Sequence, residues 1–144
     1  MRIQDLVNAP GTEREFPAET AALETVSAFV EEELERADCP MKASTQILIA
    51  LEEMFVNVAN YAYEGMQKGT VCLRTAAVEG GFLLTLRDRG IPFNPLTMED
   101  PDTSLPAGER QIGGLGVFMT KKLMDEVFYV RENGENIFSM LKLF

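Results

Sequence analysis

The sequence ILIALEEMFVNVANYAY, residues 47–63, is apolar around almost the whole circumference of a helix. A helix of this kind lies buried in the core of a domain. Pro40 suits the first helical position and Gly65 suits the position after the end, so we expect a helix from about residue 40 to residue 63. Glu53 and Asn57 interrupt the apolar run four residues apart, which puts both side chains on one helix face.

This polar pair suggests a chemical role for the helix. A buried carboxylate and carboxamide destabilise a fold by roughly several kcal/mol unless they find partners. Asn57 is a candidate oxygen ligand for Mg²⁺, and Glu53 is a candidate base for a water or hydroxyl beside it. The alternative is a solvated face, or side chains that pair with neighbouring backbone groups. Taken alone, the pair favours that alternative.

The segments around this helix predict one α+β domain over residues 1–144, a two-layer sandwich in which a mostly antiparallel mixed sheet carries helices on one face. Helical spacing of apolar residues marks the other helices, and a period of two marks the strands. We expect helices at 18–37 and 115–125, and strands at 12–16, 70–77, 82–87, 126–131 and 136–143. Turns are expected at Gly80-Gly81 and Asn133-Gly134.

Asp88 is the second candidate site residue, because it ends a predicted strand and Gly90 follows two positions later. A carboxylate there can accept a hydrogen bond from the amino group of adenine, and a glycine lets the backbone approach the ring closely. The alternative is an ordinary turn made by Asp and Gly.

A glycine cluster, Gly113, Gly114 and Gly116, immediately precedes the last predicted helix. Amides at a helix start can face an anion, and the helix dipole favours phosphate. The cluster lacks the Gly-Lys-Ser/Thr ending of a P-loop. The long segment 94–112 before it is expected to form a lid, from which Arg110 reaches the terminal phosphate; the alternative is that Arg110 is a solvated loop residue.

Composition excludes several classes of function. The net charge of −10 argues against nucleic-acid binding and against anionic membrane surfaces. The absence of histidine excludes serine–histidine and cysteine–histidine triads and the common zinc sites. Cys39 and Cys72 do not suggest a disulfide framework. The polar N-terminus and the lack of a long apolar run lead us to expect a cytoplasmic protein.

In this order, the motifs resemble those of the gyrase and histidine-kinase ATPase superfamily, also called GHKL. More narrowly, they are similar to the single-domain anti-sigma-factor serine/threonine kinases. The resemblance runs from about Phe16 to the end of the chain. EEMFVNVANYAY resembles the N-box, DRGIPFNP the first glycine box, and GGLGVFMTKKLMDEV the second.

The resemblance implies a role for each candidate residue. Glu53 would be the general base, Asn57 the Mg²⁺ ligand, and Asp88 the residue that reads adenine, with Gly90 beside it. Gly114 and Gly116 would form the phosphate turn, with Gly113 as an extra glycine. A hydroxyl on a late strand often assists adenine binding in this superfamily, and Ser139 is the candidate. Pro92 stands where the first glycine box often carries a second glycine, which puts the backbone path after Asp88 in question.

The resemblance also implies a function. We expect an ATP- and Mg²⁺-binding serine/threonine kinase that acts in a partner switch and phosphorylates an anti-sigma antagonist protein. The alternative is a nucleotide-binding module without catalysis that sequesters a sigma factor or another protein. Two further alternatives are an α+β domain that binds no nucleotide and a detached kinase domain acting on histidine or aspartate relays. The family often dimerises, so a homodimer is a further expectation.

Overall fold

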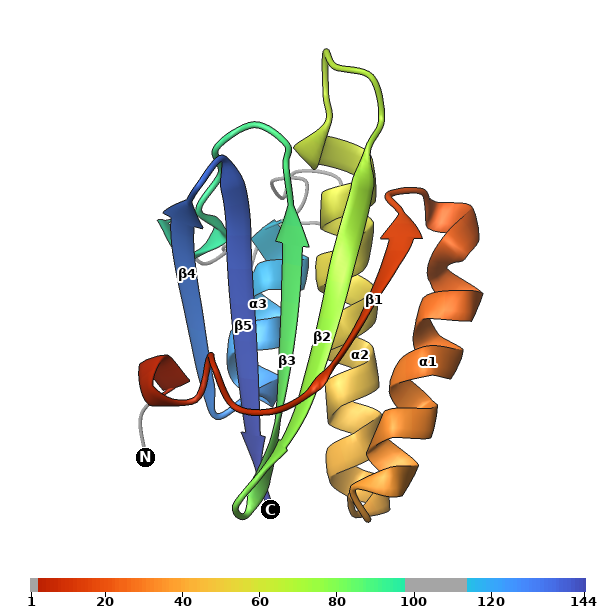
Figure 1. Cartoon of the computed structure of the whole chain (residues 1–144), viewed down its shortest axis with the longest axis vertical. Coiled ribbons are helices and arrows are strands. Elements are labelled where there is room, and N and C mark those ends of the chain that lie inside the picture. The colour runs from red at the N-terminus through yellow and green to blue at the C-terminus, as the bar shows by residue number, and fades with distance from the viewer. Residues whose placement is uncertain (1–2, 98–113) are drawn as a thin grey trace.

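The computed structural model describes residues 3–97 and 114–144 of the chain. A five-stranded sheet in the order β1-β2-β3-β5-β4 forms one layer (Figure 1). All four pairings between these strands are antiparallel, so the described sheet lacks the parallel pairing of a mixed sheet. The strands are β1 (Thr12–Pro17), β2 (Thr70–Val78), β3 (Gly81–Asp88), β4 (Glu126–Glu132) and β5 (Glu135–Leu143).

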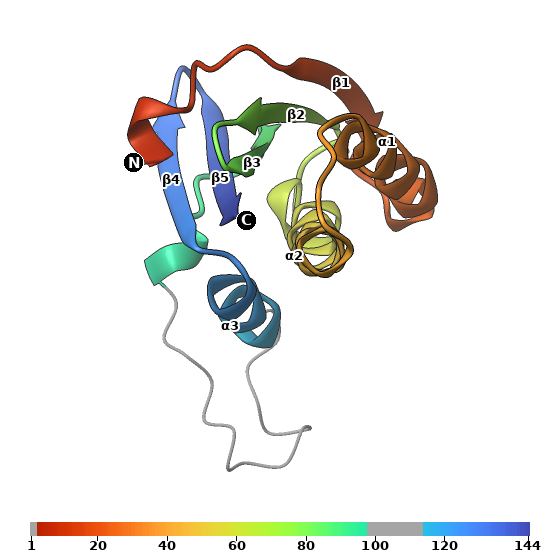
Figure 2. The same cartoon turned by 90° about the horizontal axis from the view of Figure 1, so that it is seen from below.

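The helices α1 (Leu23–Arg36), α2 (Met41–Asn57) and α3 (Gly114–Leu123) all pack on one face of the sheet (Figure 2). The predicted α+β sandwich with helices on one face is therefore confirmed. None of the helices in the described part of the chain is long and apolar enough to cross a membrane. Short 3-10 turns lie at Ile3–Asp5 (η1), Thr20–Ala22 (η2) and Pro95–Thr97 (η4).

The main core lies between the helices and the sheet. Leu51 and Phe55 of α2 are completely buried, together with Leu84 and Leu86 of β3. The almost continuous apolar character of residues 47–55 is explained by this position, because α2 has α1 on one side, α3 on the other and the sheet above it (Figure 2).

The buried helix changes its geometry immediately after Asn57. The sequence predicts one helix to about residue 63, but α2 ends at Asn57 and the chain continues as a π-helix, η3 (Val58–Ala62). The wider turn ends where the carbonyl of Ala62 accepts a hydrogen bond from the amide of Ile91 at 2.8 Å. π-Helical turns inside longer helices are frequent at functional sites. Here the turn joins the end of the helix to the segment after β3.

The two hairpin turns follow the glycine pattern. Asn133 and Gly134 both have positive φ, 53° and 78°, which is the conformation required of a tight turn between antiparallel strands. The other turn lies at Glu79-Gly80, one residue before the predicted position, because Gly81 already pairs with Val78 as part of β3.

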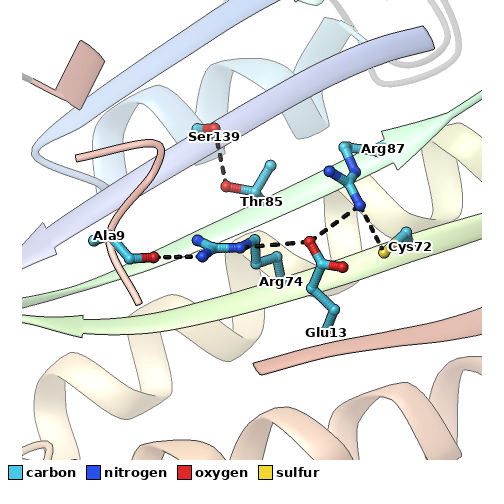
Figure 3. Close-up of polar contacts among 7 residues, drawn as sticks. All are labelled: Ala9, Glu13, Cys72, Arg74, Thr85, Arg87 and Ser139. Carbon is cyan, nitrogen blue, oxygen red and sulfur yellow. Dashed lines mark hydrogen bonds and ion pairs between the residues drawn. The ribbon is translucent and has the colours of Figure 1, made fainter. Parts of the chain in front are cut away.

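The N-terminal segment covers part of the outer face of the sheet, opposite the helices (Figure 1). Ile3 is 1 % exposed and packs with Ala76, Leu83 and Leu141, which point outward from β2, β3 and β5. The Arg74 side chain donates a hydrogen bond to the carbonyl of Ala9 and so fastens the segment farther along (Figure 3). The central strands therefore carry buried apolar residues on both faces.

Candidate functional site

A cavity of about 340 Å³ lies between η3 and the neighbouring ends of β3, β4 and β5. Asn57, Asp88 and Asn136 supply polar groups to its wall, and Glu64 lies among its lining residues. The rest of the lining is mainly apolar or aromatic: Met54, Val58, Tyr61, Ala62, Ile91, Phe93, Pro95, Tyr129 and Phe138. Such a mixture, mostly apolar with a few convergent polar groups, is typical of small-molecule sites.

Asp88 is held rigidly in this cavity. It is 6 % exposed, and its Oδ1 accepts hydrogen bonds from the Gly90 amide and from Asn136 Nδ2, both at 2.9 Å. Within the described residues, Oδ2 of Asp88 accepts no hydrogen bond. A ligand that presents an N–H group can satisfy this second oxygen, and the amino group of adenine fits that requirement.

The structure explains the glycine at position 90 by close backbone packing, whereas the sequence suggested close approach to a bound base. A Cβ at this position would lie 2.0 Å from the carbonyl oxygen of Ala62, so no side chain fits. The glycine lets the segment after β3 pack directly on the end of η3. The direct approach of Gly90 to a bound base stays a prediction.

Tyr63 also holds the segment that follows β3. Its hydroxyl donates to the carbonyl of Thr70 at 2.6 Å and accepts from the amide of Arg89 at 3.0 Å. Burial raises the pKa of the Tyr63 phenol above its usual value of about 10. The phenol therefore keeps its proton at neutral pH, as the bond to Thr70 requires.

Glu53 lies beside the first turn of α3. A Cβ on Gly116 would be 2.6 Å from Oε2 of Glu53, so the glycine leaves room for the carboxylate. Asn57 follows one turn later on α2 and lines the cavity. Within the described residues, neither side chain makes a hydrogen bond or an ion pair. The structure thus brings together Glu53, Asn57 and the N-terminal turn of α3, whose dipole favours an anion.

The donor set fits a magnesium ion that arrives with a nucleotide. In the described part of the chain, no three His, Cys, Asp or Glu side chains gather in a way that could hold a metal. Mg²⁺ is usually bound by only one or two side chains, together with substrate phosphates and water. Asn57, which lines the cavity and carries a carboxamide oxygen, matches that mode of binding.

The prediction for Ser139 is wrong. Ser139 pairs with Thr85 in the register of β3 and β5, and the two hydroxyl oxygens lie 3.0 Å apart on the outer face of the sheet (Figure 3). The β5 residue beside Asp88 is Asn136, its register partner. Because side chains alternate between the two faces, Asn136 points towards the cavity and Ser139 points away from it.

Sequence reasoning missed Asn136 and its neighbour Tyr129. Tyr129 lies on β4 and donates from its hydroxyl to Oδ1 of Asn136 at 2.6 Å. The Asn133-Gly134 turn sets only the register between β4 and β5. Asp88 pairs with Asn136 across β3 and β5, which no hairpin turn joins, so no local signal identifies the residue beside Asp88. Of the other predicted residues, Gly114 is the first residue of α3, while Arg110 and Gly113 lie outside the described residues.

Comparison with known proteins identifies the family to which the chain belongs. Residues 16–142 match the Histidine kinase-like ATPase domain. The anti-sigma F factor of Halalkalibacterium halodurans is 28 % identical over 114 residues, which cover 79 % of this chain and 75 % of that protein. The serine-protein kinase RsbW of Listeria monocytogenes is 26 % identical over 106 residues, 71 % of this chain and 68 % of that protein. The same values hold for RsbW of Listeria innocua. The chain belongs to the histidine kinase-like ATPase domain family.

Proposed function

We propose that this chain is an ATP- and Mg²⁺-dependent serine/threonine protein kinase that acts as a partner-switch regulator. Its substrate would be a hydroxyl group of an anti-sigma antagonist protein. One observation carries the catalytic part: the Glu53 carboxylate lies against Gly116, in the first turn of α3, and one turn before Asn57. The names of the relatives, serine-protein kinase and anti-sigma F factor, support the biological role.

The two ends of the nucleotide would use different parts of the site. The base would enter the cavity, where Oδ2 of Asp88 accepts its amino group between the apolar walls. The phosphates would extend towards the first turn of α3, because its amides and dipole favour negative charge. This arrangement would leave the terminal phosphate near Glu53.

In the transfer step, Glu53 would accept the proton of the substrate hydroxyl as its oxygen bonds to the terminal phosphorus and the bond to the leaving ADP oxygen breaks. Asn57 would hold Mg²⁺ through its side-chain carbonyl. When bound, Mg²⁺ would offset the negative charge on the phosphate oxygens. The remaining contribution of the chain is positioning, which accounts for a large share of catalysis in reactions between two bound groups.

A second candidate function is a nucleotide-binding module that sequesters a sigma factor without catalysis. The name of the Halalkalibacterium halodurans relative, an anti-sigma F factor, favours this candidate. Asn57 and Asp88 would serve both functions, because each needs bound nucleotide. Glu53 would matter only to the kinase.

The variant Glu53→Gln tests the proposal. We expect it to keep ATP affinity within a factor of about three and to lose phosphotransfer by at least about 100-fold, since general-base catalysis typically contributes that much. The measurement is incubation with labelled ATP and candidate antagonist proteins, with calorimetry for binding. Normal phosphorylation by the variant would refute the base assignment. ATP-dependent partner binding without transfer, in the wild type, would support the second candidate.

The same proposal assigns the chain to the cytosol, with protein partners and no direct contact to nucleic acid or membrane. The net charge of −10 supports the absence of contact with nucleic acid and with anionic membranes. The homodimer implied by the family resemblance is part of the proposal, and sedimentation equilibrium of the purified chain tests it.

A further inference from the structure

Asn136 is the centre of a hydrogen-bond network at the wall of the cavity. Its Oδ1 accepts from the Tyr129 hydroxyl at 2.6 Å and from the Phe93 amide at 3.2 Å. Its Nδ2 donates to Oδ1 of Asp88 at 2.9 Å and to the carbonyl of Ile91 at 2.8 Å. The side chain therefore links β3, β4 and the segment that follows β3.

These partners fix which way the amide points. The Phe93 amide can only donate, so it must face the oxygen of Asn136, and the Ile91 carbonyl can only accept, so it must face the nitrogen. A flipped amide would lose both bonds. Both hydrogens of Nδ2 and both acceptor positions of Oδ1 are used. Although Asn136 lines the cavity, it has no hydrogen-bonding capacity left for a ligand.

We propose that Asn136, oriented by Tyr129, is a positioning residue that sets the base selectivity of the nucleotide site. It acts through Asp88, by occupying Oδ1 and leaving Oδ2 as the acceptor presented to the cavity. A fixed acceptor pairs with a purine that carries an amino group at C6 and faces an unfavourable contact with a purine that carries a carbonyl there. This inference rests on the proposed nucleotide function.

The physical basis is the cost of an unpaired or repelled polar group in a largely apolar cavity. A site built to hydrogen-bond one group discriminates strongly against an analogue that cannot make the bond. The discrimination depends on the carboxylate staying in place, because a mobile carboxylate could turn away from a carbonyl. Asn136 and the Gly90 amide are the two groups that prevent this rotation.

Ser139 provides a matched control on the same strand. It is fully buried, and its hydroxyl is hydrogen-bonded to the side chain of its β3 register partner, as Asn136 is to Asp88. Its partner, Thr85, lies on the outer face of the sheet (Figure 3). The variant Ser139→Ala therefore perturbs β5 without touching the cavity.

The experiment compares ATP with inosine triphosphate, which replaces the C6 amino group by a carbonyl, in calorimetric titrations with Mg²⁺. Asn136→Asp keeps the shape and the acceptor for Tyr129 but places an oxygen against Oδ1 of Asp88. We expect it to lose ATP affinity by at least about tenfold, with a lower ratio of ATP to inosine triphosphate affinity. Tyr129→Phe should change the ratio in the same direction by less, and Ser139→Ala should leave it unchanged.

The outcomes separate this inference from the proposed function. If the wild type binds neither nucleotide, the proposed function fails and the inference fails with it. If the wild type prefers ATP, and a folded Asn136→Asp or Tyr129→Phe protein shows the wild-type ratio, only the inference is overturned. An equal loss of affinity for both nucleotides would also overturn it, because that result indicates a structural role alone. Tyr129→Phe keeps the test decisive if Asn136→Asp does not fold.

Discussion

Among single residues, Gly116 is one whose substitution should lower activity without lowering stability, because it contacts Glu53. A methyl group at Gly116 would lie 2.6 Å from the end of the Glu53 side chain, which is flexible enough to move away. Alanine also favours a helix over glycine by up to about 1 kcal/mol. We therefore expect Gly116→Ala to keep or raise the free energy of unfolding, measured by urea denaturation.

The displaced carboxylate should nevertheless reduce phosphotransfer by at least about tenfold, because a misplacement of roughly 1 Å is costly for catalysis. The labelled-ATP assay measures this loss. In the Glu53→Gln background the glycine substitution should have little further effect, since both changes act through one carboxylate. Full activity of Gly116→Ala would show that the position of Glu53 does not matter.

Tyr63 gives a prediction about pH. Its two hydrogen bonds lead us to expect that Tyr63→Phe lowers the free energy of unfolding by about 1–3 kcal/mol at pH 7. Burial raises the pKa of the folded phenol, so the unfolded chain loses this proton first as pH rises. The stabilisation is therefore complete below the unfolded pKa of about 10 and is lost as pH rises through the folded pKa.

Urea denaturation at pH 8 and at pH 10.5 tests the direction of this pH dependence. The difference in stability between wild type and Tyr63→Phe should narrow at the higher pH. A constant or growing difference would contradict the assignment of a raised pKa to Tyr63.

At the scale of the element, the segment after β3 is positioned by the end of η3. A Cβ at Gly90 would meet the backbone of Ala62, which cannot move aside as a side-chain end can. We expect Gly90→Ala to destabilise the fold by about 1–3 kcal/mol and to weaken ATP binding, because Asp88 would shift with the segment.

Gly80→Ala is the control for this substitution. Gly80 lies at the opposite end of β3 and has φ of 71°. Among the described residues, only the carbonyl oxygen of Phe144 lies within 4 Å of its Cβ position, at 3.9 Å. Its replacement should cost stability through backbone strain and leave ATP affinity intact. Equal ATP affinity for both folded variants would refute the link between η3 and the site.

Some elements of the fold follow from the local sequence and others depend on tertiary packing. The helix over residues 41–57 and the Asn133-Gly134 turn follow from local patterns, and both are found. Local patterns do not predict which residues of β5 face the helices, because β5 is apolar on both sides. Phe138 and Met140 pack against the helices, while Leu141 packs under the N-terminal segment. With apolar residues on both faces, alternation could not distinguish Ser139 from Asn136 as the residue beside Asp88.

The π-helical turn also could not be predicted from the sequence, because it depends on tertiary contacts. Residues 58–62 continue the apolar pattern of α2, so the sequence favours one uninterrupted helix. The bond from Ile91 to Ala62 and the fit of Gly90 against it involve residues almost thirty positions away. The sequence predicts that Glu53 and Asn57 share a helix face, because four-residue spacing is a local property. The contact between Glu53 and α3 depends on the tertiary fold and could not be predicted in this way.

At the scale of the whole molecule, charge decides how a nucleotide can bind. The chain carries a net charge of −10, and the described residues that line the cavity include Asp88 and Glu64 but neither lysine nor arginine. A triphosphate would meet unfavourable electrostatics unless a cation accompanies it. We expect chelation of Mg²⁺ to lower ATP affinity by at least about tenfold, measured by titration with and without the chelator.

The nucleotide site is tested most directly by a calorimetric titration of ATP into the purified chain, with and without Mg²⁺, for the wild type and for Asp88→Asn. We expect Mg²⁺-dependent binding by the wild type and a loss of at least about tenfold in the variant, because the amide presents a donor where the base needs an acceptor. Absence of wild-type binding in the presence of Mg²⁺, or equal binding by Asp88→Asn, would refute the nucleotide site and leave a role in protein interaction alone.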